Sequence, residues 1–245
     1  MNLDIDIGNT RIKWRVVDGS DVLVRGSQLT ESVRQDSPLE IGALKSIDRV
    51  RVSCVAEKAI VKKLQSQCHT QFGVWPELAE VSQRAAAVVC GYQNYSQLGI
   101  DRWLALVAAY NKYSSSVIVI DAGSAVTIDI VEAGGVHCGG YIVPGLSLMH
   151  QALWQGTTQV KVESAKLLEI DSPGKTTQEA VDKGCLISLV GMIESLVARH
   201  QSRLVITGGD AEQLCSALDM DAELCPDLVL EGLTLEGIFL RSTVG

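Results

Sequence analysis

The chain has 245 residues, of which 47% are hydrophobic, and it carries a formal net charge of −8. This length and apolar content predict a globular protein with one large domain or two small ones and exclude an intrinsically disordered chain. The acidic charge and the lack of a basic run argue against nucleic acid as the main partner.

Cysteine and histidine spacing gives no sign of a metal cluster. The seven cysteines include no Cys-x-x-Cys pair, and the four histidines show no His-x-x-x-His spacing. Met1 leads directly into an apolar strand without the features of a signal peptide, and no apolar run approaches the ~20 residues of a membrane span. We therefore expect a soluble cytoplasmic protein without a membrane partner, whose histidines are structural or exposed.

The elements of the first half are predicted by alternation and by helical spacing. An apolar strand runs into the motif Asp6-Ile7-Gly8-Asn9-Thr10, and a second strand with period-two alternation follows it. Further strands are expected over 22–29 and 50–55, with a helix over 57–68. Three strands therefore come first, and helix and strand then alternate.

The segment Gly99-Ile100-Asp101-Arg102 begins a helix predicted over 101–113, where apolar residues recur at 103, 104, 107 and 110. A carboxylate at the start of a helix stabilises it by about 1 kcal/mol, which is one explanation of Asp101. The functional alternative makes Asp101 a base for a substrate hydroxyl. In that case the planar fork of Arg102 would hold polar groups of the substrate.

Ser114-Ser115-Ser116 interrupts the helical spacing, and the pattern of the first half then begins again. The last strand ends in Thr207-Gly208-Gly209-Asp210, where Asp210 is predicted to cap the next helix. A domain boundary at the serines gives domains 1–114 and 115–245. The elements expected in the second half are strands over 117–121, 125–131, 136–143 and 204–206 and helices over 146–154 and 178–200.

Two motifs share the form Asp-x-Gly-polar at the end of a strand, Asp6-Ile7-Gly8-Asn9 and Asp121-Ala122-Gly123-Ser124. Glycine in a tight turn lets main-chain N–H groups approach an anion, and an aspartate at the strand end can hold a cation. Ordinary hairpins use the same turn residues, so one copy alone would favour that explanation. Two aligned copies favour duplicated domains that face each other across a nucleotide.

In this order the motifs resemble those of type III pantothenate kinases, a family of the acetate kinase/Hsp70/actin superfamily that begins coenzyme A synthesis. The resemblance spans nearly the whole chain, and the Gly-x-Asp-Arg element between two Asp-x-Gly hairpins is its specific part. It implies an α/β fold of two duplicated ribonuclease H-like (actin-like ATPase) domains of βββαβα plan, with ATP in the cleft between them. Further matching positions are Lys13, Trp103, Gly139-Gly140, Pro144-Gly145, Thr177, Ala180, Gly184 and Thr207-Gly208-Gly209-Asp210.

The resemblance also implies the activity, an ATP-dependent phosphorylation of pantothenate with Asp101 as the proton acceptor. Mg²⁺ would accompany ATP. Asp121 would occupy the metal site and bind a monovalent cation, potassium or ammonium. The family is dimeric, with its pantothenate pocket completed near the subunit interface, so a homodimer is expected. The nucleotide-binding residues carried over are Asp6, Ile7, Gly8, Asn9, Thr10, Arg11, Ile12, Lys13 and Ser124. Those carried over for pantothenate are Tyr92, Gly99, Ile100, Asp101, Arg102 and Thr177.

Two other functions fit the same motifs. The Asp-x-Gly hairpins do not encode the acceptor, so the first is another superfamily kinase that acts on a small hydroxy acid or a sugar. The second is a nucleotide-binding accessory regulator without kinase activity. Asp101 argues against the regulator, because a protein that only binds nucleotide does not need this carboxylate.

Overall fold

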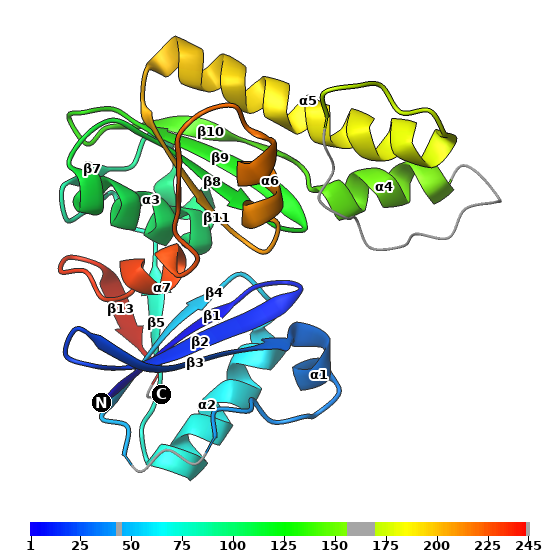
Figure 1. Cartoon of the computed structure of the whole chain (residues 1–245). Helices are drawn as coiled ribbons and strands as arrows, with labels where there is room; N and C mark the ends of the chain where they lie inside the picture. The colour runs from blue at the N-terminus through cyan, green and yellow to red at the C-terminus, as the bar shows by residue number, and fades with distance from the viewer. Residues whose placement is uncertain (43–45, 156–169, 244–245) are drawn as a thin grey trace. The chain divides into compact units, whose positions relative to one another are not determined.

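The computed structural model describes residues 1–42, 46–155 and 170–243. The chain forms two compact units, the first from residues 1–112 and 227–245 and the second from residues 113–226 (Figure 1). Each unit is built on a mixed sheet and has its own hydrophobic core. Within the described ranges, no helix has both the length and the apolar character that a membrane crossing requires.

The first unit is built around strand β1 (Asn2–Ile7), which pairs antiparallel with β2 and parallel with β4. Its sheet has the strand order β13-β5-β4-β1-β2-β3. The other strands are β2 (Arg11–Asp18), β3 (Asp21–Leu29), β4 (Arg49–Cys54), β5 (Glu77–Glu80) and β13 (Phe239–Ser242), and β6 (Arg84–Ala85) pairs with β7 (Val88–Val89) in a short hairpin. The helices are α1 (Thr30–Arg34), α2 (Lys58–Phe72), α3 (Ile100–Tyr113) and α7 (Leu228–Gly232), with a 3₁₀ turn at Tyr95–Gln97.

Alternation along β1 separates an apolar face of the sheet from a polar one. Leu3, Ile5 and Ile7 are fully buried and pack with apolar residues of β2, β4, α1 and α2. Figure 1 shows both helices on the same side of this sheet. Asp4 and Asp6 lie on the opposite face, because successive side chains of a strand alternate.

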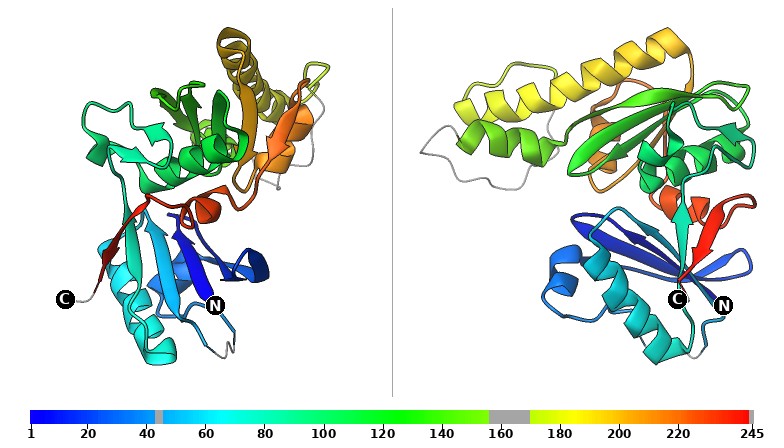
Figure 2. Two further views of the ribbon diagram at one scale, coloured as in Figure 1. Left: turned by 90° about the vertical axis from the view of Figure 1, so that its left-hand side faces the viewer. Right: turned by 180° about the vertical axis from the view of Figure 1, so that it is seen from behind.

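The second unit repeats this arrangement around β8 (Val117–Ala122), with the strand order β10-β9-β8-β11-β12. Ile118 and Ile120 of β8 pack with apolar residues of α5 and α6 in the core. Figure 2 shows α4 beside the long helix α5. The other elements are β9 (Ala125–Val131), β10 (His137–Pro144), β11 (Arg203–Thr207), β12 (Ala222–Leu224), α4 (Leu146–Gln155), α5 (Thr177–His200) and α6 (Ala211–Ala217).

The strand order confirms the predicted duplication. In both units the first strand pairs antiparallel with the second and parallel with the fourth, and the second pairs antiparallel with the third. The parallel pairing of the fourth and fifth strands is also repeated, as β4 with β5 and β11 with β12. The expected strands and helices are all found with small shifts at their ends; α2, for example, continues to Phe72.

Residues 227–245 come from the second half of the sequence but belong to the first compact unit. Within this segment, β13 pairs antiparallel with β5. The predicted domains, 1–114 and 115–245, rest on sequence duplication, which is a different criterion from compactness. They stay a prediction.

The predicted capping role of Asp210 is wrong. Asp210 stands at the N-cap position of α6, but its side chain makes no capping hydrogen bond. Its backbone N–H donates to the carbonyl oxygen of Ala122 at 2.9 Å, and burial raises the pKa of its carboxyl group. The turn before α6 is therefore held by a backbone bond to β8.

A buried ion cluster lies on the polar face of the first sheet. Asp4 is fully buried, and the Nε atoms of Arg15 and Arg51 donate to its two carboxylate oxygens at 3.1 and 2.7 Å. Arg15 Nη2 also donates to the carbonyl oxygen of Leu230 in α7 at 2.9 Å. The cluster thus connects β1, β2, β4 and α7, and each charge depends on the others because water is excluded.

Replacing Asp4 by alanine is expected to lower the free energy of unfolding by about 3–5 kcal/mol, because two buried guanidinium groups lose their carboxylate. Urea unfolding monitored by circular dichroism measures the loss. The control is Glu223→Ala, which removes the partner of an exposed ion pair, Arg203 Nη1 to Glu223 Oε1 at 2.9 Å. That variant should lose no more than about 1 kcal/mol. Equal losses in the two variants would contradict the structural role of the buried cluster.

Candidate functional site

The first Asp-x-Gly turn joins β1 to β2 and is held by backbone hydrogen bonds. Gly8 N donates to Arg11 O at 3.0 Å, and a Cβ atom at position 8 would lie 3.0 Å from the same oxygen. Thr30, at the start of α1, donates from Oγ1 to Gly8 O at 2.8 Å and from N to Thr10 O at 3.0 Å. Asn9, Thr10 and Arg11 are exposed, so this turn offers its polar groups to a ligand from a fixed backbone.

The second turn joins β8 to β9 in a similar way. Gly123 N donates to Ala125 O at 3.1 Å, and Gly145 N donates to Ser124 O at 3.0 Å. A Cβ atom at position 145 would lie 2.0 Å from Gly123 O, so only glycine allows this close approach. Ser124 is exposed at the tip of the turn.

The two turns are tied to the fourth strand of each sheet by matching bonds. Val55 N, directly after β4, donates to Ile7 O at 3.1 Å, and Asp210 N, after β11, donates to Ala122 O at 2.9 Å. Ile7 and Ala122 occupy the same position in their Asp-x-Gly motifs. In both units the strand before the turn thus accepts a backbone bond from the chain that follows the fourth strand, one residue beyond β4 and three residues beyond β11.

Asp101 lies in the first turn of α3. Its Oδ1 accepts a hydrogen bond from Arg102 N at 2.8 Å, and a Cβ atom at position 99 would lie 2.5 Å from the same Oδ1. Trp103 N donates to Gly99 O at 3.0 Å. The carboxylate thus does accept a backbone N–H of the first turn, as the simpler explanation of Asp101 requires, but it does so in a fixed position against a glycine.

Arg102 and Tyr92, which the resemblance places at the same substrate, are in contact with each other. Arg102 Nη1 donates to Tyr92 Oη at 2.9 Å, and Arg102 Cζ lies 5.6 Å from the centroid of the Tyr92 ring. Arg102 is buried, with 7% of its surface exposed. This cation–π and hydrogen-bonded pair fixes a positive charge one residue from Asp101.

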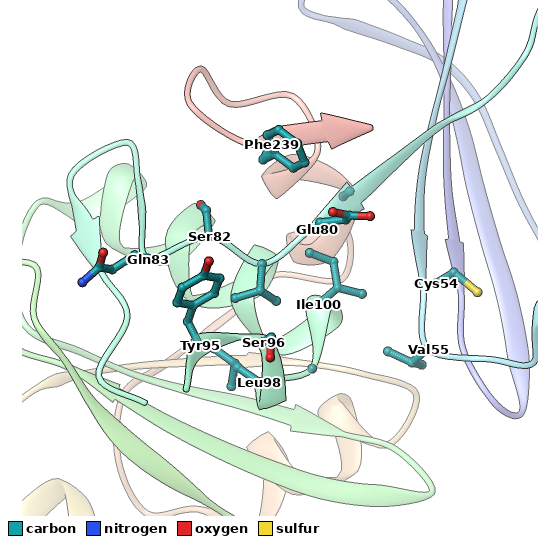
Figure 3. A pocket seen from close by; sticks show the side chains of 13 residues that line it. Cys54, Val55, Glu80, Ser82, Gln83, Tyr95, Ser96, Leu98, Ile100 and Phe239 are labelled. Atoms are coloured by element: carbon teal, nitrogen blue, oxygen red, sulfur yellow. The ribbon is translucent and has the colours of Figure 1, made fainter. Parts of the chain in front are cut away.

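A cavity of about 820 Å³ borders the same segment. Gly99 and Ile100 form part of its wall, together with residues at the ends of β4 and β5, the 3₁₀ turn and Phe239 of β13 (Figure 3). Figure 3 shows the Ile100 side chain between those of Glu80 and Leu98. The volume of this cavity lies within the range of small-molecule pockets. Cys54 also lines it, and burial raises the pKa of this thiol, so that it is present as the neutral thiol.

Comparison with known proteins decides the family. A sequence model described as type III pantothenate kinase matches residues 2–199. A type III pantothenate kinase of Pseudomonas aeruginosa is 36% identical over an alignment of 250 positions, which covers 96% of this chain and 98% of that protein. The chain belongs to the type III pantothenate kinase family.

Two solved structures resemble this member of the type III pantothenate kinase family in fold. A Campylobacter jejuni protein described as a Baf family transcriptional activator has a TM-score of 0.63, 22% identity and 94% coverage of each chain. Component A of (R)-2-hydroxyglutaryl-CoA dehydratase from Acidaminococcus fermentans has a TM-score of 0.52 and 16% identity, and covers 95% of this chain and 94% of that one. At these identities the likeness concerns the fold alone, and it supports two ribonuclease H-like, actin-like ATPase halves.

The residues expected to serve a type III pantothenate kinase fall into four places. Residues 6–13 form the first turn with its flanking strands, Asp121 and Ser124 belong to the second, and Tyr92 and residues 99–102 gather at the start of α3. Thr177 is the exposed first residue of α5, in the second unit. The hydroxyl of its neighbour Thr176 caps α5 by accepting from Glu179 N at 3.1 Å. The functional role of each residue stays a prediction.

Sequence reasoning missed Thr30, whose two bonds hold the first turn. Thr30 is fully buried and lies 22 positions from Gly8, at the end of a predicted strand. Nothing in its local sequence distinguishes it from any threonine that follows a strand. Only the folded hairpin brings it to the turn.

The cations expected in this family would be held without a preformed cluster of side chains. In the part of the chain that the structure describes, no three His, Cys, Asp or Glu side chains are grouped to bind a metal. Mg²⁺ is commonly held by one or two carboxylates together with substrate phosphates and water. A single aspartate beside an exposed turn, such as Asp6, fits that pattern.

Gly99→Ala is expected to reduce the turnover of phosphoryl transfer roughly tenfold to a hundredfold, because its Cβ would displace the Asp101 carboxylate from its position. ATP affinity should stay unchanged. Steady-state kinetics and calorimetric ATP titration measure the two effects. The control is Gly134→Ala, at a glycine with no atom within 4 Å of its ideal Cβ. Normal turnover in Gly99→Ala would show that the position of the carboxylate does not matter.

Proposed function

We propose that this chain transfers the γ-phosphoryl group of ATP to the primary hydroxyl of pantothenate, giving 4′-phosphopantothenate in the first step of coenzyme A biosynthesis. Family membership supports the reaction. The observation that carries the assignment of the site is the Asp101 carboxylate, held by Arg102 N against Gly99 and one residue from the buried Arg102–Tyr92 pair. A base and an anchor for an anionic acceptor thus stand together.

Asp101 is the proposed acceptor of the hydroxyl proton. Phosphoryl transfer passes through a loose transition state, so orientation of the attacking oxygen and neutralisation of phosphate charge contribute more than proton removal. The hydrogen bond from Arg102 N fixes the direction of the carboxylate. The guanidinium of Arg102 and the hydroxyl of Tyr92 suit the carboxylate of pantothenate, and Gly99, Ile100 and Thr177 are proposed to complete its site.

ATP is proposed to use both Asp-x-Gly turns. Residues 6–13 would contact its phosphates through the exposed turn and Lys13, and Ser124 would contact it from the second turn. When bound, Mg²⁺ and a monovalent cation, potassium or ammonium, would neutralise charge on the phosphates. Asp6 and Asp121, at the ends of β1 and β8, are the carboxylates proposed to stand beside these ions.

A homodimer is proposed from the apolar surface of the second unit. Tyr141 of β10 is 48% exposed, and Leu148, Leu153 and Ile187 of α4 and α5 are also exposed. Exposed apolar side chains on neighbouring elements favour burial against another surface, and a second copy would supply one. The cytoplasm, where the thiols of the described cysteines would remain reduced, is the proposed location.

Asp101→Asn is expected to lower the turnover of pantothenate phosphorylation by about a hundredfold or more, because the amide cannot accept the proton. ATP affinity should be nearly unchanged. Purified protein is incubated with Mg–ATP, pantothenate and potassium, and 4′-phosphopantothenate is detected by mass spectrometry. The control is Glu212→Gln, which removes an exposed first-turn carboxylate from α6.

If Asp101→Asn keeps near-normal turnover, Asp101 is not the base. If the unaltered protein binds ATP but forms no 4′-phosphopantothenate, the pantothenate assignment fails. Product from another hydroxy acid or a sugar would then favour a related kinase, and no product from any acceptor would favour the regulator.

Asp121→Ala is expected to raise the potassium concentration for half-maximal activity at least about tenfold, since even outer-shell partners of a metal affect its affinity by that much. Product is measured by mass spectrometry over a series of potassium concentrations, which avoids coupling enzymes with their own potassium requirement. Asp219→Ala, at an exposed aspartate of the same unit, is the control. An unchanged potassium dependence would show that the cation does not bind at Asp121.

A further inference from the structure

The polar face of the first sheet carries two aspartates with different neighbours. Asp4 is paired in register with Arg15 of β2 and Arg51 of β4, and both arginines donate to it. Asp6 is paired in register with Lys13 of β2 and Ser53 of β4. The first aspartate is therefore part of a closed ion cluster, whereas the second stands beside a hydroxyl at the edge of the candidate nucleotide turn.

Ser53 has a polar group that the described residues do not satisfy. Its side chain is fully buried, and its Oγ makes no hydrogen bond within the part of the chain that the structure describes. Leaving a buried hydroxyl without a partner costs free energy, so such groups call for a specific explanation. Because neighbouring strands lie about 4.8 Å apart and paired residues share a face, Ser53 and Asp6 direct their side chains to the same region.

The second unit contains the same pair. Asp121 is in register with Thr207 of β11, which is buried with 2% of its surface exposed. β11 pairs parallel with β8 as β4 pairs with β1. A hydroxyl residue thus stands beside the aspartate of both Asp-x-Gly motifs, at the carboxyl end of a parallel strand where ligands of α/β sheets commonly bind.

We propose that Ser53 positions the Mg²⁺ that arrives with ATP and that Thr207 is a ligand of the monovalent cation. The Ser53 hydroxyl, beside Asp6, accepts or donates a hydrogen bond in the hydration shell of the Mg²⁺ that arrives with ATP. The Thr207 hydroxyl, beside Asp121, provides a neutral oxygen for the monovalent cation. The inference rests on the proposed function for the identity of the two ions.

The chemistry of the two ions explains why hydroxyl groups suit these positions. Mg²⁺ keeps several of its water molecules when it binds, and a hydroxyl can both accept from and donate to them. Potassium is coordinated by neutral oxygen dipoles that replace its water. A second carboxylate at either position would add charge, whereas an alanine or valine would leave a gap in the polar shell.

The test uses Ser53→Ala and Thr207→Val in the full chain. ATP affinity is titrated by calorimetry in EDTA and over a series of Mg²⁺ concentrations, and product formation is followed over a series of potassium concentrations. In Ser53→Ala, the increase in ATP affinity that Mg²⁺ produces should be roughly tenfold smaller than in the unaltered protein. The ATP affinity in EDTA and the potassium dependence of product formation should not change. Thr207→Val should raise the half-maximal potassium concentration roughly tenfold and leave the Mg²⁺-dependent gain unchanged.

Thermal unfolding without nucleotide separates positioning from a structural role. Ser53→Ala removes an unsatisfied buried hydroxyl, so its melting temperature should be equal to or above that of the unaltered protein. A lower melting temperature together with an unchanged Mg²⁺-dependent affinity would overturn the proposal for Ser53. An unchanged potassium dependence in Thr207→Val would overturn it for Thr207.

Failure of the proposed function is a distinct outcome. If the unaltered protein forms no 4′-phosphopantothenate, the binding titration still tests Ser53, because it measures Mg²⁺-dependent ATP affinity without pantothenate. Loss of that Mg²⁺-dependent gain in Ser53→Ala would then support the cation role in a protein with another acceptor. Retention of the full gain would overturn it.

Discussion

The register of the central strand decides where the side chains around each Asp-x-Gly motif lie. β1 places Leu3, Ile5 and Ile7 in the core, and the alternate residues Asp4 and Asp6 on the polar face. A slip of one residue against β2 and β4 would exchange these two sets, burying carboxylates among apolar side chains. The paired arginines of Asp4 hold the register from the polar side, while the apolar core holds it from the other. The position of Asp6 beside the turn follows from both.

The two turns share a backbone but differ in side chains, and this difference separates their chemistry. Asp6 has Lys13 as a register neighbour on β2, so a positive charge accompanies it. Asp121 has Thr127 and Thr207 as its register neighbours on β9 and β11. An aspartate between two threonines provides one negative charge together with neutral hydroxyl oxygens. This combination suits a monovalent cation better than a carboxylate whose neighbour is a lysine. Under the proposed function, duplication supplies one framework for two kinds of phosphate-side contact.

Much of this arrangement could be predicted from the sequence, because it follows from local patterns. Alternation and helical spacing indicated the strands and helices, and the repeated Asp-x-Gly motif indicated the duplication. Contacts between distant segments could not be predicted in this way. The bond from Thr30 to Gly8, the pairing of Arg51 with Asp4 and the pairing of β13 with β5 each depend on the folded sheet. Asp210 shows the opposite failure, since a favourable capping residue is held by a backbone bond to Ala122 instead.

The pairing of β13 with β5 also sets an order for folding during synthesis. β5 is paired with β4 on one side, and its other side remains an open strand edge until residues 239–242 have left the ribosome. All of the second unit, residues 113–226, is made in that interval and has its own core. The second unit can therefore fold before the first sheet has its last strand. The sheet that the first residues of the chain begin is completed by a strand from its last residues.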